Sequence, residues 1–244
     1  MSRFYYDFHI HSCLSPCGDD ESTPNSIAGM ASLCGLDVVA LTDHNTAKNC
    51  PAFFEAAERY GVIPIAGMEL TTAEDIHMVC LFETLEGALE FDGRVAKERI
   101  LIKNRTDIFG QQLIVDSCDN ILGTDEHLLV TASLITIDNA PAIAEQYGGI
   151  CYPAHIDRQS NGIITALGTF PTVPHFSAFE LNDADNAAEF VEKYALGGKF
   201  AVFGSDAHNL GDIPDASSYL ELQCDKADAK GVRREILSML KGMD

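Results

Sequence analysis

The sequence is poor in basic residues. It contains 16 lysine and arginine residues against 37 aspartate and glutamate residues, which gives a formal net charge of −21. No basic run offsets this charge, because the densest stretch, residues 97–105, is typical of the solvated face of a helix. A surface this acidic repels nucleic acids and anionic membranes. We therefore predict that the chain binds neither a long nucleic acid nor a membrane.

The sequence also lacks segments that direct a protein into a membrane. No window is apolar for long enough to span a bilayer, and residues 1–11 lack the apolar core of a signal peptide. We expect a cytoplasmic protein whose eight cysteines are reduced thiols. There is no C-x-x-C pair for a structural zinc. Cys13 and Cys17 are therefore expected to be small thiols that line a site, with a thiolate metal ligand as the alternative.

Strand and helix patterns alternate along most of the chain. A length of 244 residues fits one large domain, or one domain with an insertion. Short apolar runs bounded by turn residues predict an edge strand over 218–222 and seven core strands. The core strands cover 5–10, 37–42, 62–68, 76–82, 149–154, 178–181 and 199–204. Helices are predicted over 24–34, 51–60, 185–195 and 229–241, and the fold class is therefore α/β.

One connection is too short for a parallel crossover. Only residues 70–75 lie between Glu69 and the strand 76–82, so the two strands should pair as an antiparallel hairpin. The hairpin would bring Glu69 and His77 to the same end of the sheet. Residues 84–147 are polar and are predicted to be a helical insertion, a candidate cap over the site. Residues 1–83 and 148–244 would then form a barrel-like domain with seven strands, close to the eight of a regular (β/α) barrel.

Imidazoles and carboxylates gather at the ends of the predicted strands. His9 and His11 form an H-x-H pair, which places both rings on one face because strand side chains alternate with a period of two. The other candidates are Asp43, His44, Glu69, His77, His155, Asp206 and His208. In (β/α) barrels, chemistry lies at the C-terminal ends of the strands. The set predicts a site for more than one divalent ion, for which Zn, Fe and Mn fit about equally well.

These motifs resemble a known series. HIHS at 9–12, LTDH at 41–44, AHIDR at 154–158 and GSDAH at 204–208, with Glu69 and His77 between them, are similar to the motifs of the PHP superfamily, named for polymerase and histidinol phosphatase. The resemblance covers residues 6–210 in order. It implies a distorted seven-stranded barrel with two or three divalent ions. The metal ligands that it implies are His9, His11, His44, Glu69, His77, His155, Asp206 and His208.

The loop after the H-x-H pair departs from the family pattern. The family usually has a further ligand there, often within S-x-x-S-D-G. This chain has Ser12 and Ser15, then P-C-G at 16–18, followed by Asp19 and Asp20. We take Asp19 as the loop ligand, with Asp20 as its alternative.

Four residues are given roles beyond metal binding. Asp43 is predicted to orient a ligand or a metal-bound water. Arg158 lies where the family has an arginine that grips phosphate, and its planar fork can bind a phosphoryl group with two hydrogen bonds. The alternative for Arg158 is a surface ion pair with Asp157. The candidates for the proton donor to the leaving group are His208, His175 and a metal-bound water.

Together these residues predict a metal-dependent phosphoesterase that hydrolyses a small phosphorylated molecule, nucleotides included. The expected nucleophile is a hydroxide that bridges two ions, because bound cations lower the pKa of water. The alternative is a non-catalytic, metal-binding regulatory or interaction module. The apparently complete ligand set and Arg158 disfavour that alternative.

Overall fold

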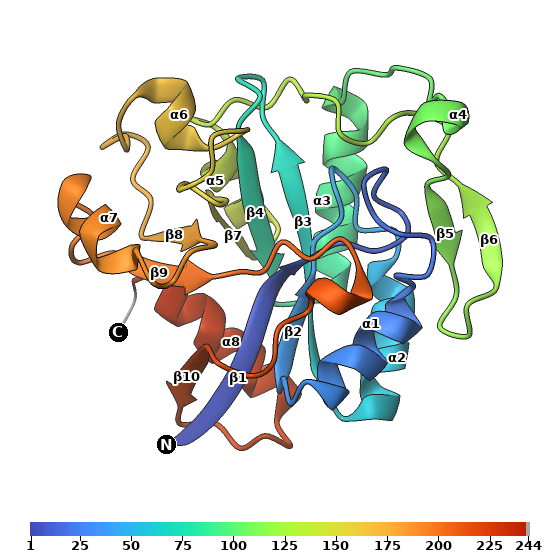
Figure 1. Ribbon diagram of the computed structural model, residues 1–244, viewed down its shortest axis with the longest axis horizontal. Helices are drawn as coiled ribbons and strands as arrows, with labels where there is room; N and C mark the ends of the chain where they lie inside the picture. Colours follow the sequence, from blue (N-terminus) through green and yellow to red (C-terminus); the bar gives the residue numbers. More distant parts are fainter. Residues whose placement is uncertain (243–244) are drawn as a thin grey trace.

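The computed structural model describes residues 1–242, and its centre is a curled sheet of six strands (Figure 1). The strand order is β10-β1-β2-β3-β4-β7. Strands β1, β2 and β3 are parallel, β4 is antiparallel to both of its neighbours, and β10 is antiparallel to β1. The bounds are β1 Ser2–Ile10, β2 Val38–Leu41, β3 Ile63–Thr71, β4 His77–Phe82, β7 Gly149–Pro153 and β10 Tyr219–Leu222.

Two further strands form a separate parallel pair, β8 (Ala178–Leu181) and β9 (Phe200–Phe203). Strand β8 contacts β7 and strand β9 contacts β1, so the pair extends the curl of the main sheet. All seven predicted core strands are present, and the α/β class is confirmed. The continuous seven-stranded barrel is not confirmed. Within residues 1–242 these strands are divided between two hydrogen-bonded sheets, and β10 extends the larger sheet beyond β1.

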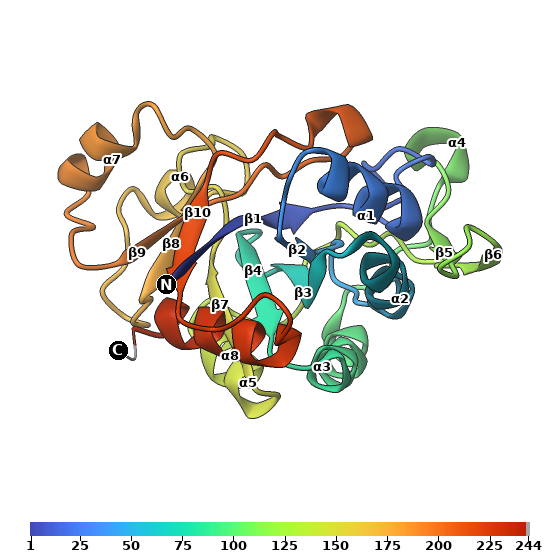
Figure 2. The ribbon, with the colours of Figure 1, turned by 90° about the horizontal axis from the view of Figure 1, so that it is seen from below.

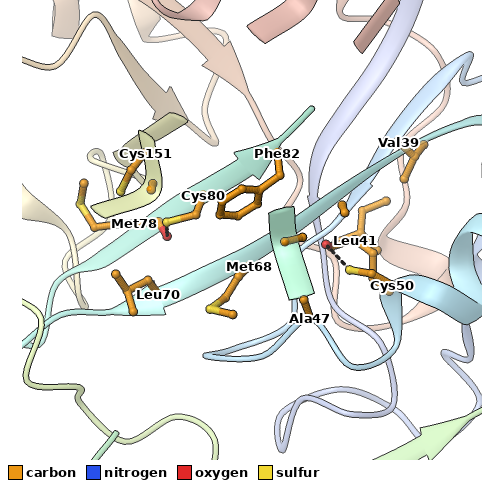
Figure 3. Packing of buried hydrophobic residues seen from close by; sticks show 14 of the residues in the cluster. Val39, Leu41, Ala47, Cys50, Met68, Leu70, Met78, Cys80, Phe82 and Cys151 are labelled. Atoms are coloured by element: carbon orange, nitrogen blue, oxygen red, sulfur yellow. Dashed lines mark hydrogen bonds between the residues drawn. The ribbon is translucent and has the colours of Figure 1, made fainter. Parts of the chain in front are cut away.

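Helices cover the sheet on both sides (Figure 2). Residues of α1 (Pro24–Leu33), α2 (Cys50–Tyr60), α3 (Leu85–Glu98) and α5 (Ala140–Gln146) pack with the larger apolar core, part of which is drawn in Figure 3. Helix α8 (Ala229–Leu240) packs with a second core on the inner side of the curl. The shorter helices are α4 (Thr106–Phe109), α6 (Ile163–Leu167), α7 (Ala187–Lys193) and the 3-10 turn Leu210–Asp212.

Local chemistry explains where the first two helices begin and end. The Thr23 hydroxyl accepts a hydrogen bond from Ser26 N, and Pro24 is the first residue of α1. Both features satisfy or remove backbone donors that a helix start leaves unpaired. Gly61 ends α2 with a φ of 71°, a conformation that costs glycine little. These predicted boundaries are confirmed to within one residue.

The hairpin of β3 and β4 is confirmed. The ladder pairs Glu69 with Val79 and Thr71 with His77, which brings the side chains of Glu69 and His77 together. The connection 72–76 is a tight turn in which Asp75 N donates to Thr72 O. The hairpin therefore places two candidate ligands from one continuous segment in a single cluster.

The segment 84–147 is less helical than predicted. It contains α3, α4 and α5, but also a two-stranded hairpin of β5 (Leu113–Val115) and β6 (Ile121–Thr124). The Asn45 side chain donates to Leu129 O at 2.6 Å and to Thr131 O at 2.9 Å, so the segment is attached beside His44. Its role as a cap stays a prediction, as does the division into 1–83, 84–147 and 148–244. Residues 243–244 lie outside the described residues.

Among residues 1–242, none of the helices combines the length and the apolarity that crossing a bilayer requires.

Candidate metal centre

The first strand shifts its register as it enters the site. Pairing of β1 with β2 is irregular between Asp7 and Ile10. Phe8 packs in the inner core, whereas Ile10 packs in the outer one, so the alternation of side chains changes between them. An irregularity of this kind re-aims the side chains that follow it. The Nε2 atoms of His9 and His11 meet at 3.1 Å, as the H-x-H spacing predicted.

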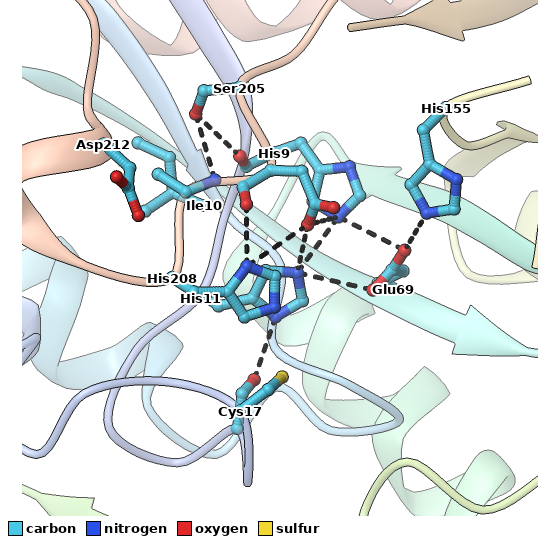
Figure 4. Close-up of polar contacts among 12 residues, drawn as sticks. His9, Ile10, His11, Cys17, Glu69, His155, Ser205, His208 and Asp212 are labelled. Atoms are coloured by element: carbon cyan, nitrogen blue, oxygen red, sulfur yellow. Dashed lines mark hydrogen bonds and ion pairs between the residues drawn. The ribbon is translucent and has the colours of Figure 1, made fainter. Parts of the chain in front are cut away.

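Five imidazoles surround the carboxylate of Glu69, a fully buried residue of β3. Figure 4 shows His9, His11 and His155 beside this carboxylate. His9 comes from β1 and His77 from the start of β4, and the other three come from the loops that follow β1, β2 and β7. The distances to the nearer Glu69 oxygen are 2.8 Å for His77 Nδ1, 2.9 Å for His44 Nδ1, 3.0 Å for His155 Nε2, 3.3 Å for His11 Nε2 and 3.4 Å for His9 Nε2. Segments far apart in the sequence therefore converge on one carboxylate.

Asp206 is the second carboxylate of the cluster and follows β9. Its Oδ1 lies 3.0 Å from His11 Nε2 and 3.2 Å from His9 Nε2. His208 donates from Nδ1 to the Asp206 carbonyl oxygen at 2.7 Å if that nitrogen carries the proton, and its ring stacks on that of His11 with centroids 4.3 Å apart. Asp206 and His155 have positive φ values of 54° and 25°. Such backbone strain is common at functional sites.

The geometry fits divalent cations. Three overlapping groups each bring their ligand atoms within 4.8 Å of one another: His11 with His44 and His208; His9 with His11, Glu69 and Asp206; and His44 with Glu69 and His77. Three buried atoms of these groups, His44 Nδ1, Glu69 Oε2 and Asp206 Oδ1, lie close to one another or to His11 Nε2, but none of these contacts has the direction of a hydrogen bond. Imidazole nitrogens and carboxylate oxygens are common ligands of Zn, Fe and Mn. The shared members of the groups place the candidate sites next to one another.

The pKa values of the buried histidines and carboxylates indicate which protons a bound cation would displace. Burial disfavours a charged His9, but Glu180, Asp206 and Glu69 outweigh it and raise its pKa well above the ordinary value. His11, buried but beside Asp206 and Glu69, has its pKa raised to about 9. Despite burial, neighbouring histidines lower the pKa values of Glu69 and Asp206. Protons on His9 and His11 thus balance the carboxylates, and bound cations would displace those protons.

The other two histidines of the first group lose their protons more easily. Burial lowers the pKa of His44 to about 3, although Glu69 opposes it. Burial, with the charge of His11 next, lowers the pKa of His208 to about 4. Both rings are therefore neutral near pH 7, which is the state in which an imidazole binds a metal.

Asp43 lies behind the ligands and fixes the loop after β1. Its Oδ1 accepts from Ser12 N at 2.7 Å and from Ser15 Oγ at 2.8 Å. Ser15 Oγ in turn lies 2.9 Å from His11 Nδ1 and accepts from His44 N at 3.2 Å. Burial raises the pKa of Asp43, opposed by His11 and by these serine contacts. The contacts connect Asp43 to two candidate ligands, while its predicted contact with a metal-bound water stays a prediction.

Arg158 forms an ion pair with Asp206 through Nη1, and its side chain is 42% exposed. Asp157, the alternative partner, instead accepts hydrogen bonds from the backbone N–H groups of Asn182 and Asp183. The guanidinium therefore lies beside the candidate metal centre with part of its surface free for a ligand. His175 is exposed and lines a different cavity, together with Glu145 and Lys241.

The loop carboxylate predicted as a ligand does not reach the cluster. Asp19 N donates to His208 O, which fixes the backbone near the site, but the Asp19 side chain is exposed and accepts from Glu21 N at 2.8 Å. In the described part of the chain, neither Asp19 nor Asp20 belongs to the three groups. Besides Ser15, Cys17 of this loop approaches a ligand, with its Sγ 3.2 Å from His44 Nε2. The ligand role of Asp19 stays a prediction that this geometry does not favour.

Glu180 is a site residue that the sequence analysis missed. It lies in β8, is fully buried, and its Oε1 is 2.8 Å from His9 Nδ1 and accepts from His155 N at 3.1 Å. The available signal was a carboxylate inside the apolar run AFEL at 178–181. A charged residue is almost never fully buried unless it has a partner.

A family model of the PHP domain matches residues 7–136, which is more than half of the chain. A curated relative, the error-prone DNA polymerase of Symbiobacterium thermophilum, is 34% identical over 77 residues, which are 32% of this chain and 7% of that protein. The chain therefore spans only a small part of this relative.

Several solved structures share the fold. The lesion-specific endonuclease Endonuclease Q from Pyrococcus furiosus has a TM-score of 0.65 at 18% identity, and the match covers 100% of this chain and 57% of that one. A protein from Bifidobacterium adolescentis described as a metal-dependent phosphoesterase has a TM-score of 0.60 at 17% identity, covering 93% and 96%. At these identities the likeness establishes the fold alone.

The prediction of a small phosphorylated partner, to the exclusion of long nucleic acids, is wrong. Endonuclease Q also matches in a complex with a 27-mer duplex that has an abasic lesion at the active site, with a TM-score of 0.64 at 17% identity. This fold can therefore accept a long polyanion. Net charge describes the whole surface, whereas cations and Arg158 would determine the potential at the site.

Proposed function

Because the chain belongs to the PHP domain family, we propose that it is a metal-dependent phosphoesterase that hydrolyses a phosphodiester bond of a nucleic acid. Family membership and the phosphoesterase fold neighbour support a hydrolase of the phosphoesterase type. The observation that carries the proposal is the buried carboxylate of Glu69 with five imidazoles within 3.4 Å.

Two or three divalent ions would be held by residues on or just after six strands of the two sheets. The proposed ligands are His9, His11, His44, Glu69, His77, His155, Asp206 and His208. When bound, such ions lower the pKa of water and stabilise negative charge on phosphoryl oxygens. Asp43, through Ser12 and Ser15, keeps the loop of His11 and the backbone of His44 in place.

Arg158 would bind the phosphate of the substrate. It is partly exposed, and Asp206 orients it by an ion pair. A guanidinium can hold two phosphate oxygens in parallel hydrogen bonds, and this selects a phosphoryl group over a carbonyl. His208 is 24% exposed at its side chain and has a depressed pKa, so near pH 7 it is neutral and acts as a ligand rather than as an acid.

The nucleic-acid substrate is supported by two similar proteins whose names concern DNA, the error-prone DNA polymerase and Endonuclease Q. The chain spans 7% of the first and 57% of the second, so their whole activities are not carried over. The Endonuclease Q match covers the whole of this chain, the H-x-H pair included.

The test is turnover of defined oligonucleotides. The purified chain with Mn²⁺, Zn²⁺ or Fe²⁺ is incubated with single-stranded DNA, intact duplex DNA and a duplex that has an abasic site. We expect metal-dependent cleavage of at least one of these, lost in His9→Ala and retained in Glu189→Gln, a change at an exposed residue of α7. Absence of cleavage by folded, metal-bound protein would contradict the proposal and favour the non-catalytic metal-binding module.

A further inference from the structure

Glu180 lies beneath the metal centre and contacts two of its histidines. Its Oε1 is 2.8 Å from His9 Nδ1 and accepts from His155 N at 3.1 Å. Strand β8 belongs to the separate two-stranded sheet, whereas His9 lies on β1 of the main sheet. Glu180 therefore links the two sheets at the point where the ligands converge.

Burying the carboxylate of Glu180 costs hydration free energy, which specific polar contacts must offset. The residue is 0% exposed, and its Oε2 has no hydrogen-bond partner. Buried carboxylates need partners to offset the loss of hydration. In β8 the neighbouring Phe179 and Leu181 pack in the outer apolar core, and an apolar residue at 180 would suit the inner core. Packing alone does not explain a glutamate at this position.

The other histidines of the centre have different outer partners. His11 Nδ1 contacts the neutral hydroxyl of Ser15, and His208 Nδ1 contacts a backbone carbonyl. Among these three, His9 is the one with a carboxylate within hydrogen-bond distance of Nδ1, since the Asp206 carboxylate lies 3.7 Å from His208 Nδ1. A carboxylate there favours the tautomer with the proton on Nδ1, which leaves the Nε2 lone pair for a metal and makes it a stronger donor.

We propose that Glu180 is a positioning residue of the metal centre, which holds His9 with its proton on Nδ1 and its Nε2 directed at the ions. This inference rests on the proposed metal-dependent function, but it concerns metal binding and does not require turnover. Through His155 N, the same oxygen also fixes the backbone of a second candidate ligand, at a residue whose φ is 25°.

Gly204 supplies the space that Glu180 needs. A Cβ atom at this position would lie 2.5 Å from Glu180 Oε2 and 2.9 Å from His9 Cβ. A side chain there would separate the two contacting residues. The glycine of the GSDAH motif is thus explained by the close approach of β1, β8 and the loop after β9.

The test measures metal affinity by competition with a chelator, using Zn²⁺ as the ion, for Glu180→Gln and Glu180→Ala. The loss of an outer partner of a metal-bound histidine typically weakens binding about 10- to 100-fold. We expect about tenfold for Glu180→Gln, which keeps one acceptor oxygen, and about 100-fold for Glu180→Ala. The control Glu189→Gln, an exposed residue of α7, should bind Zn²⁺ like the parent protein. If Glu180→Ala does not fold, Glu180→Gln carries the test alone.

A spectroscopic measurement separates positioning from general destabilisation. Long-range ¹H–¹⁵N correlations of the zinc-loaded protein report which nitrogen of His9 carries the proton. We expect Nδ1–H in the parent protein and a weakened or mixed pattern in Glu180→Gln. Unchanged zinc affinity in both variants, or a proton on Nε2 of His9 in the parent protein, would overturn the proposal. Failure of the oligonucleotide assay alone would leave this result standing.

Discussion

Glu69 and Asp206 are both buried carboxylates of the same site, but they are held in different ways. Glu69 lies in regular strand backbone and is ringed by five imidazoles. Asp206 lies in a loop with a positive φ, and it shares its oxygens between two histidines and the partly exposed Arg158. The Glu69 side is thus enclosed by imidazoles, whereas the Asp206 side has a strained backbone and reaches the solvent through Arg158. We infer that the Glu69 side holds the ions and that the Asp206 side also meets the substrate.

The largest effect is expected from Glu69→Gln. This change removes the negative charge that lies among five imidazoles and leaves the side-chain volume nearly unchanged. Metal affinity should fall by more than about 100-fold, the upper end of what losing only an outer partner costs. Metal content after dialysis and chelator competition measures it. Glu58→Gln, an exposed change on α2, is the matched control. Near-parental metal content in Glu69→Gln would contradict the inference that the Glu69 side holds the ions.

Asp206→Asn should reduce activity more than it reduces metal binding. The ions held around Glu69 keep most of their ligands, whereas the orientation of Arg158 depends on the Asp206 carboxylate. We expect activity on the preferred oligonucleotide to fall about 100-fold or more, as for the loss of a charged contact at a reacting phosphate. The metal content should stay above that of Glu69→Gln. Equal loss of metal in both variants would mean that Glu69 and Asp206 contribute equally to metal binding, which would contradict the separate roles inferred for them.

Arg158→Ala should leave metal binding unchanged and lower kcat/KM. A hydrogen bond to a charged group contributes about 1.5–3 kcal/mol, so kcat/KM should fall about 10- to 100-fold. Arg158→Lys should recover only part of this loss, because an ammonium lacks the planar fork. Steady-state kinetics and metal analysis test both statements. An unchanged kcat/KM in Arg158→Ala would contradict the proposed contact between Arg158 and the substrate phosphate.

The smallest expected effect is on the pH dependence of stability in the metal-free protein. His11 has a pKa of about 9 in the fold, above its ordinary 6.5, so its protonated form stabilises the fold fully below pH 6.5. That stabilisation, about 3 kcal/mol in order of magnitude, is lost as the pH rises through 9. Tm should therefore fall between pH 7 and 9 without metal. His11→Asn should reduce the dependence and leave the part that His9 contributes, whereas the exposed His175→Asn should retain all of it. A flat profile in the parent protein would contradict the charge balance.

The strand-borne part of the site could be predicted from the sequence. The meeting of the H-x-H rings and the hairpin of Glu69 and His77 were predicted from strand periodicity and from a six-residue connection, and the structure confirms both contacts. The periodicity itself is interrupted between Asp7 and Ile10, and His11 lies just after β1. The loop-borne part was harder, because loop side chains follow hydrogen bonds rather than a period. Asp19 shows this, since its backbone binds at His208 O while its carboxylate turns outward.

Contacts between distant segments escaped the sequence analysis. Glu180 meets His9 across 171 positions, and no motif spacing connects them. The division of the strands into two sheets depends on packing between β7 and β8, which strand patterns do not encode. The exclusion of nucleic acids failed for a related reason, because a net charge carries no information about where a local site lies.

The most direct measurement is the anomalous scattering of crystals grown with Mn²⁺ or Zn²⁺, collected on both sides of the metal absorption edge. We predict at least two peaks close together, one within bonding distance of Glu69 and His77 and another near His9, His11 and Asp206. Absence of peaks there at saturating metal, with the histidine rings turned away from Glu69, would contradict the account.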